Sequence, residues 1–128
     1  MRGVLNAIAA HAYREAPREC CGMLIGSATA VTEAVAARNI AEKPTRFVID
    51  PQGHIDAIRR ARQLGLEVLG FYHSHPHSSA APSETDRAEA SYPNHLYVIV
   101  GLEHAPPEIR FFRLTDGNFL ELGFVTLD

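Results

Sequence analysis

Three histidines and an aspartate are concentrated in one short stretch of the chain, residues 73–86. His73 and His75 are separated by a single residue, and Asp86 follows eleven residues after His75. If the two histidines lie at the end of a β-strand, both side chains project from the same face, with Cα atoms roughly 6–7 Å apart. Two imidazoles at that separation can bind one metal ion. Without further context, however, two histidines at this spacing are more often exposed residues of a loop.

The carboxylate of Asp86 has two competing interpretations. As a third ligand beside His73 and His75 it would leave the fourth tetrahedral position to water, which is typical of a catalytic zinc site and not of a closed structural one. As a structural residue it would complete a capping box over residues 83–86, with Ser83 as the helix N-cap and Asp86 where Glu or Gln is usual. We expect these roles to exclude each other, because a carboxylate bound to metal is poorly placed to reach back to the cap.

A hydrolytic metal site also needs a group that takes a proton from the attacking water and later delivers one to the leaving amine. Glu19 is the candidate for this role, because a sheet could bring it beside the strand that carries His73. Considered alone, a glutamate in this place is more often a solvated residue at the end of a strand. The adjacent Cys20 and Cys21 have no second cysteine pair with which to form a closed site, and we expect both to be buried thiols.

The other histidines are not spaced as ligands. We expect His77 to be exposed or to lie just outside the site, because Pro76 bends the chain after His75. For the remainder we expect positions at the surface or in the core: His11, His54, His95 and His104.

Helical periodicity and cap residues predict the elements that carry these side chains. Apolar residues at helical spacing predict a first helix over residues 2–15. Asp50 followed by Pro51 predicts the start of a second helix, which Gly65 should end. A third, short helix is predicted over residues 83–90.

Apolar runs between turn residues predict the strands. Residues 66–72 show little alternation, which suits a strand covered on both faces in the middle of a sheet, and such a strand would be a rigid support for the histidines. The other predicted strands are 20–26 and 30–37, which form a hairpin, and 47–49, 95–102, 108–114 and 119–127. Together these elements predict one α/β domain over residues 1–128, with a mixed, mainly antiparallel sheet flanked by about three helices.

The composition is ordinary for a globular protein, with 46% apolar and 21% charged residues. A net charge of -3 disfavours nucleic acid as a partner, because phosphate binding normally needs a basic face. No apolar run approaches the roughly 20 residues of a membrane helix, and the first residues lack the apolar core of a signal peptide. We therefore expect a cytoplasmic protein with no membrane or nucleic-acid partner.

The joint spacing of these residues resembles the JAMM motif of the MPN-plus metalloproteases. That motif is a distant Glu, then His-x-His-Pro, and, after seven positions that include this Pro, Ser-x-x-Asp; Glu19, residues 73–76 and residues 83–86 match it at every defining position. The resemblance covers nearly the whole chain, although the last third matches only in outline, and it implies the MPN fold, which is similar to that of cytidine deaminases. It implies one catalytic zinc ion, and it assigns roles to five residues. The zinc ligands would be His73, His75 and Asp86, the general acid/base would be Glu19, and Ser83 would contact the zinc-bound water or stabilise the oxyanion.

In this family the scissile amide bond typically follows the C-terminal Gly-Gly of ubiquitin or a ubiquitin-like protein. The chain looks most similar to small stand-alone bacterial and archaeal members, some of which process sulfur carrier proteins. The resemblance therefore implies a zinc metalloprotease or isopeptidase that cleaves after the Gly-Gly tail of a ubiquitin-like or sulfur carrier protein, by glutamate-assisted attack of zinc-bound water. A monomer and a homodimer both remain open.

Two other functions compete with this one. The first is a metal-free MPN-type scaffold that only binds partners; such scaffolds usually lack one or more ligands, and none is missing here. The second is a zinc deaminase of related fold, which would need a His-x-Glu and a Pro-Cys-x-x-Cys pattern. Neither pattern occurs in this chain.

Overall fold

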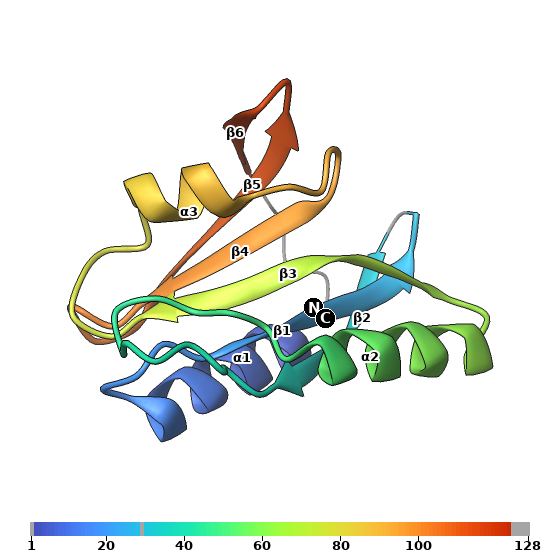
Figure 1. Cartoon of the computed structure of the whole chain (residues 1–128), viewed down its shortest axis with the longest axis horizontal. Coiled ribbons are helices and arrows are strands. Elements are labelled where there is room, and N and C mark those ends of the chain that lie inside the picture. The colour runs from blue at the N-terminus through green and yellow to red at the C-terminus, as the bar shows by residue number, and fades with distance from the viewer. Residues whose placement is uncertain (1, 29, 124–128) are drawn as a thin grey trace.

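The computed structural model describes residues 2–28 and 30–123. Its strands form one six-stranded sheet (Figure 1). The strand order is β2-β1-β3-β4-β5-β6, and every neighbouring pair is antiparallel except β3 and β4, which are parallel. This confirms the predicted mixed, mainly antiparallel sheet with three helices. The elements in chain order are α1 (Arg2–Glu15), β1 (Cys21–Ser27), β2 (Ala30–Ala37), α2 (Pro51–Gln63), β3 (Glu67–His75), α3 (Glu84–Glu89), β4 (Leu96–Gly101), β5 (Glu108–Thr115) and β6 (Asn118–Leu122).

Strand β3 occupies the middle of the sheet, between β1 and β4, as its unbroken apolar sequence predicts. It extends to His75, three residues beyond the predicted end, because its last residues still pair with both neighbours: Cys21 of β1 lies opposite His73, and Gly101 of β4 lies opposite His75. The two histidines are therefore held by a strand hydrogen-bonded on both sides.

The two faces of the sheet form two separate cores. Helix α1 covers one face, where Ile8 packs in the same cluster as Tyr72. Helix α2 covers the other face, where Ala57 packs in the same cluster as Phe71. Because side chains alternate along a strand, His73 and His75 share the face of Phe71 and lie on the side of α2.

The helices begin and end at the residues that the cap signals predict. The side chain of Asp50 accepts a hydrogen bond from Gln52 N (3.0 Å), Pro51 opens α2, and Gly65 follows its C-cap with a φ of 70°. In α1 the buried residues include Val4 and Ile8, one helical turn apart on the side that meets the sheet. No helix among the described residues is both long enough and apolar enough to cross a membrane.

Two strand predictions need comment. The predicted strand 47–49 is wrong: this segment has only one isolated bridge, between Asn39 and Ile49, and is otherwise a loop. The segment makes two main-chain hydrogen bonds to residues 38–40, from Ile40 N to Val48 O (2.9 Å) and from Asp50 N to Arg38 O (3.0 Å), but the N–H of Val48 bonds to the side chain of Asn39, so the ladder does not extend further. The last predicted strand is confirmed as far as Leu122, and residues 124–127 lie outside the described part of the chain.

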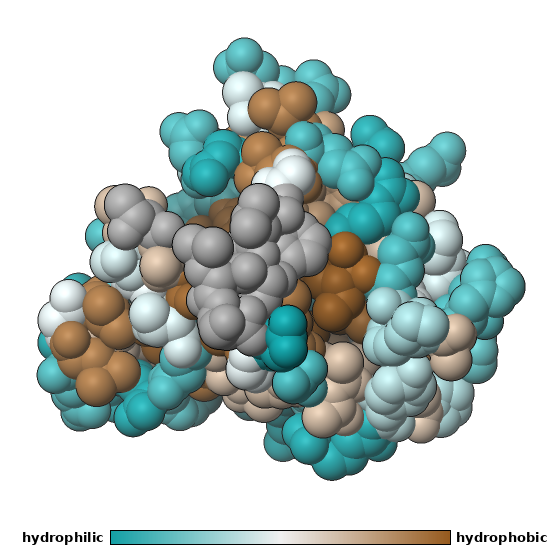
Figure 2. Space-filling model, turned by 180° about the vertical axis from the view of Figure 1, so that it is seen from behind, coloured by the Kyte–Doolittle hydropathy of each residue, from teal (hydrophilic) through white to brown (hydrophobic). Residues whose placement is uncertain are grey.

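The surface opposite to the view of Figure 1 is mixed in polarity (Figure 2). Hydrophilic residues form most of its outline, and hydrophobic ones show in smaller groups between them.

The buried thiols agree with the prediction: Cys20 and Cys21 are free and at most 1% exposed, and burial raises the pKa of Cys20 to about 11. Both cysteines are therefore packing residues of the core.

Candidate metal centre

The end of β3 presents two imidazoles to one point. His73 and His75 are both buried, at 3% and 6% exposure, and their Nε2 atoms are 3.3 Å apart. The strand alternation that places both side chains on one face is a local property of the sequence. The prediction of a shared face is confirmed, and the alternative of two exposed loop histidines is wrong.

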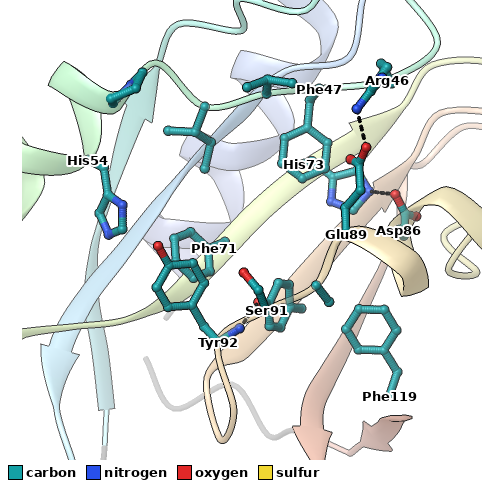
Figure 3. A pocket seen from close by; sticks show the side chains of 15 residues that line it. Arg46, Phe47, His54, Phe71, His73, Asp86, Glu89, Ser91, Tyr92 and Phe119 are labelled. Carbon is teal, nitrogen blue, oxygen red and sulfur yellow. Dashed lines mark hydrogen bonds and ion pairs between the residues drawn. The ribbon is translucent and has the colours of Figure 1, made fainter. Parts of the chain in front are cut away.

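Asp86 completes the cluster from the first turn of α3. Its Oδ1 lies 3.1 Å from Nε2 of His73 and its Oδ2 lies 3.0 Å from Nε2 of His75. The candidate ligand atoms of these three residues all lie within 4.8 Å of one another. Figure 3 shows Asp86 of α3 and His73 of β3 facing each other.

The segment between the histidines and α3 is packed against the ends of β4 and β5. Ala80 is fully buried, and its N–H donates to Oε1 of Glu108 (2.8 Å). Gly101 allows this close approach, because a Cβ at that position would lie 2.6 Å from Ala80 N. The return of the chain towards the histidines is thus fixed by contacts that the sequence does not reveal.

The two roles considered for Asp86 coexist, so the prediction that they exclude each other is wrong. Oδ2 of Asp86 accepts a hydrogen bond from Ser83 N (2.9 Å), and Asp86 N donates to Ser83 Oγ (3.0 Å), which forms the complete capping box. The reason is that a carboxylate has about four lone-pair sites on two oxygens, enough for the cap and for both imidazoles. The cap therefore fixes the direction of the carboxylate towards the histidines.

The hydrogen bonds of His75 define its tautomer. Its Nδ1 lies 2.8 Å from the carbonyl oxygen of Ser79, which can only accept, so Nδ1–H is the donor. The second nitrogen, Nε2, is then the one available to a metal ion, the usual arrangement for a metal-binding histidine. The ring of His73 is held differently, by stacking on Phe47 with centroids 4.3 Å apart.

The cluster is electrostatically coupled. Burial acts to raise the pKa of Asp86, but hydrogen bonds from His73 and His75 outweigh it and hold that pKa well below its usual range. Burial lowers the pKa of His73. For His75 burial also acts to lower the pKa, but the hydrogen bonds to Asp86 and to the Ser79 carbonyl raise it overall. An ionised Asp86 facing the Nε2 atoms of His73 and His75 places negative charge and nitrogen lone pairs at one point, so the site fits a cation.

Glu19 lies beside the cluster and is buried, with 8% exposure. Because Cys21 pairs with His73 in antiparallel register, the chain two residues earlier is level with His75. Oε1 of Glu19 has no hydrogen-bond partner among the described residues, and burial raises the pKa of this carboxyl to about 7. The solvated strand-end alternative is therefore wrong, and the orphaned oxygen is available to a ligand of the site.

A cavity of about 480 Å³ opens directly from His73 and Asp86. Its walls are mostly aromatic and aliphatic, and Figure 3 shows Phe47, Phe71 and Tyr92 around it. At its edge an ion pair joins Arg46 to Glu89 of α3. The sequence does not predict this cavity. The apolar run 47–49 is the sequence feature that contributes to its wall, but its pattern predicts a strand.

The other histidines lie outside the cluster. His77 is exposed, as predicted, and His11 is buried in the core with its Nδ1 2.7 Å from the hydroxyl of Tyr72. His54 is partly buried and lines the aromatic cavity, which the prediction of a surface or core position did not specify.

Comparison with protein-family models matches residues 1–115 to the family described as prokaryotic homologs of the JAB domain. A desampylase of Haloferax volcanii is 38% identical over 101 residues, which cover 73% of each chain. A probable TtuB-protein conjugate cleaving protease of Thermus thermophilus is 35% identical over 98% of this chain and 80% of the relative. A CysO-cysteine peptidase of Mycobacterium tuberculosis is 31% identical over 92% of this chain and 83% of the relative.

Solved structures show the same architecture. Protein DSY2949 from Desulfitobacterium hafniense superposes with a TM-score of 0.90 at 28% identity, over 98% of this chain and 89% of that one. A JAB1/MPN domain protein from Archaeoglobus fulgidus superposes with a TM-score of 0.59 at 25% identity, over 94% of this chain and 93% of that one.

Proposed function

The chain belongs to the JAMM/MPN family, among the prokaryotic JAB-domain proteins, and from this we propose that it is a zinc metalloprotease of ubiquitin-like or sulfur carrier proteins. Its reaction would be hydrolysis of the amide bond that follows a C-terminal Gly-Gly, with residues 1–128 as the metalloprotease domain. The names of the relatives support this substrate class, since they describe a desampylase, a protease of TtuB conjugates and a CysO-cysteine peptidase.

The observation that carries the proposal is the convergence of three buried ligand atoms beside Glu19, whose carboxylate has an oxygen without a partner among the described residues. His73, His75 and Asp86 supply two nitrogens and one oxygen, a donor set that suits zinc and leaves room for a fourth ligand. A zinc ion bound there would polarise the scissile carbonyl and lower the pKa of a water molecule.

Glu19 would move the protons of the reaction. It would take a proton from the attacking water and then deliver it to the nitrogen of the leaving amine. A carboxyl with a pKa of about 7 can do both near neutral pH, because its charged and neutral forms are then both populated. Its buried position keeps bulk water from competing for that proton.

Ser83 would stabilise charge on the carbonyl oxygen. Its Oγ already accepts a hydrogen bond from Asp86 N, which fixes the oxygen at the edge of the cluster. A serine hydroxyl still has one O–H to donate after such a bond, and a donor aimed at the developing oxyanion stabilises the transition state.

The apolar cavity beside His73 would bind the substrate chain ahead of the scissile bond. Two glycines have no side chains and can pass close to the metal ligands, where bulkier residues would collide. An apolar side chain upstream of them would then occupy the cavity between Phe47 and Tyr92. The site would thereby select a tail by its shape and hydrophobicity.

The experiment combines metal analysis with a cleavage assay. The purified protein should contain near one equivalent of zinc, and it should release a peptide joined by an amide bond to the Gly-Gly end of a ubiquitin-like protein. Glu19→Gln should keep the zinc and lose most of the activity, because it retains shape and loses the basic oxygen. Cleavage at the wild-type rate by this variant would refute the role of Glu19. Binding of the ubiquitin-like protein without any transition metal or cleavage would support the scaffold alternative instead.

A further inference from the structure

The side chain of Asn39 uses its full hydrogen-bonding capacity on main-chain groups. Its Nδ2 donates to the carbonyl of Glu19 (2.9 Å) and to the carbonyl of Arg46 (3.1 Å). Its Oδ1 accepts from Ala41 N (3.0 Å) and from Val48 N (3.0 Å). An asparagine amide has two N–H donors and one oxygen with two lone pairs, so no further bond is possible. Three of these bonds are to residues of the segment 39–49, which is called the Asn39 loop below.

Glu19 depends on this loop for its main-chain hydrogen bonds. It precedes β1 and lies outside the paired strands, its N–H donates to the carbonyl of Pro44 (3.2 Å), and its carbonyl accepts from Asn39. On the other side, Cys20 N donates to Ser74 Oγ (2.8 Å), which joins the following residue to the strand of the histidines. The backbone of Glu19 is thus held between the Asn39 loop and β3.

The same loop forms one wall of the cavity. Phe47 stacks on the ring of His73, and Arg46 forms the ion pair with Glu89 of α3. The loop has no regular secondary structure, apart from the single bridge at Asn39, that could hold these side chains in place. The Asn39 amide contributes four of the hydrogen bonds that hold the loop, beside main-chain bonds such as that from Ile40 N to Val48 O (2.9 Å).

We propose that Asn39 is a positioning residue that fixes the carboxylate of Glu19 relative to the metal ligands and also holds the cavity wall. The inference rests on the proposed function, in which Glu19 moves the proton. A catalytic group must be held within a fraction of an ångström, and a displacement of about 1 Å can cost on the order of 100-fold in rate. Asn39 contributes through its contact with Glu19 and needs no contact with the substrate.

The variant Asn39→Asp distinguishes the donor function of the amide from its acceptor function. This variant keeps oxygen acceptors for Ala41 and Val48 but loses both N–H donors, to the carbonyls of Glu19 and of Arg46. It also places a carboxylate oxygen against those carbonyls. We expect kcat to fall about 10- to 100-fold, KM to change much less, and zinc content to stay the same. Asn39→Ala loses all four bonds and should lower kcat and raise KM together. The matched control is Asn118→Asp, which makes the same change of charge at the exposed start of β6, where Nδ2 donates to Asp116 O (3.4 Å). It should leave kcat, KM and zinc content unchanged.

A double-mutant cycle tests whether Asn39 acts through Glu19. Adding Asn39→Asp to Glu19→Gln should give no further loss of residual turnover, because the positioned group has already been removed. The same fold loss in both backgrounds would overturn the proposal.

Amide hydrogen exchange tests the same contact without any substrate. In Asn39→Asp the lost bond to the Glu19 carbonyl should loosen the attachment of Glu19 to the Asn39 loop, so the Glu19 amide, which donates to Pro44 O of that loop, should exchange faster. The amides of Ala41 and Val48 should stay protected by the retained oxygen. Unchanged exchange at Glu19 would also overturn the proposal. If the wild-type protein cleaves no substrate, the proposed function fails, but the exchange experiment still decides whether Asn39 positions Glu19.

Discussion

One carboxylate oxygen, Oδ2 of Asp86, lies 3.0 Å from Nε2 of His75 and accepts the cap hydrogen bond from Ser83 N at 2.9 Å. The start of α3 and the candidate metal centre therefore share an atom. A residue that serves only as a ligand can swing on its side-chain torsions, whereas this carboxylate is held by the first turn of a helix. The centre is pre-organised for a metal ion on both sides, by β3 and by α3.

Replacement of Asp86 by Ala should abolish stoichiometric zinc binding. Two neutral imidazoles remain, and neither charge nor a third ligand atom is left at the site. The variant should also lose helix-cap stabilisation of about 1 kcal/mol. Zinc titration and thermal unfolding in the presence of a chelator measure the two effects separately; retention of one equivalent of tightly bound zinc would contradict the ligand assignment.

Replacement of Ser83 should affect capping and catalysis together, and two variants test this. Ser83→Ala removes both the acceptor for Asp86 N and the O–H donor, so we expect a loss of about 1 kcal/mol in stability and about 100-fold in kcat. Ser83→Thr keeps both groups and should retain most of each. Steady-state kinetics beside thermal unfolding provide the measurement. If Ser83→Ala keeps the full kcat, Ser83 is only a cap.

The stability of the metal-free protein should depend on Glu19 in a defined direction. The pKa of Glu19 is about 7 in the folded protein against 4.5 for the unperturbed group, so the folded state binds more protons between these values. The contribution of this group to the free energy of unfolding therefore falls by up to about 3 kcal/mol as the pH rises from about 4.5 to about 7. It stays low at higher pH. Glu19→Gln should remove this loss. Its stability relative to the wild type should therefore be higher at pH of about 8 than at pH of about 5.

Denaturant unfolding with chelator at both pH values measures this difference. Glu121→Gln is the control without this pH dependence, because the hydrogen bond from Arg110 lowers the pKa of Glu121, so this carboxylate is already largely ionised at both pH values and its effect on stability should be nearly the same at each. A stability difference between Glu19→Gln and the wild type that does not vary with pH would show that Glu19 keeps its ordinary pKa.

Obstruction of the cavity should weaken substrate binding without changing the chemistry. Val48 lines the cavity and is 39% exposed, so Val48→Trp can fill the space without disturbing the core. We expect KM for the ubiquitin-like protein to rise about 10-fold or more, which corresponds to roughly 1.4 kcal/mol of lost binding, with kcat and zinc content retained. Leu120→Trp, at an exposed position of β6 that does not line the cavity, should leave KM unchanged. Equal KM values for both variants would place the substrate elsewhere.

Local chemistry explains why much of the fold could be predicted. Asp50, Pro51 and Gly65 act through their own backbone and side-chain preferences, so α2 begins and ends where these residues stand. The shared face of His73 and His75 follows from strand alternation alone. The prediction of a strand over residues 47–49 is wrong because this apolar run pairs with residues 38–40 at a single bridge only, and the N–H of Val48 bonds to the side chain of Asn39.

The sequence by itself determined which residues could bind a metal, because two histidines on one strand face and an aspartate in the first turn of a helix are short-range features. Only the tertiary structure decided that the Asp86 carboxylate serves the cap and the centre together, and that Glu19 is buried beside His75 with an unpartnered oxygen. It also decided that Asn39, twenty residues away from Glu19, holds the backbone of Glu19. These relationships arise from strand register and from the need of buried main-chain groups for partners, and both depend on segments that are distant in the sequence.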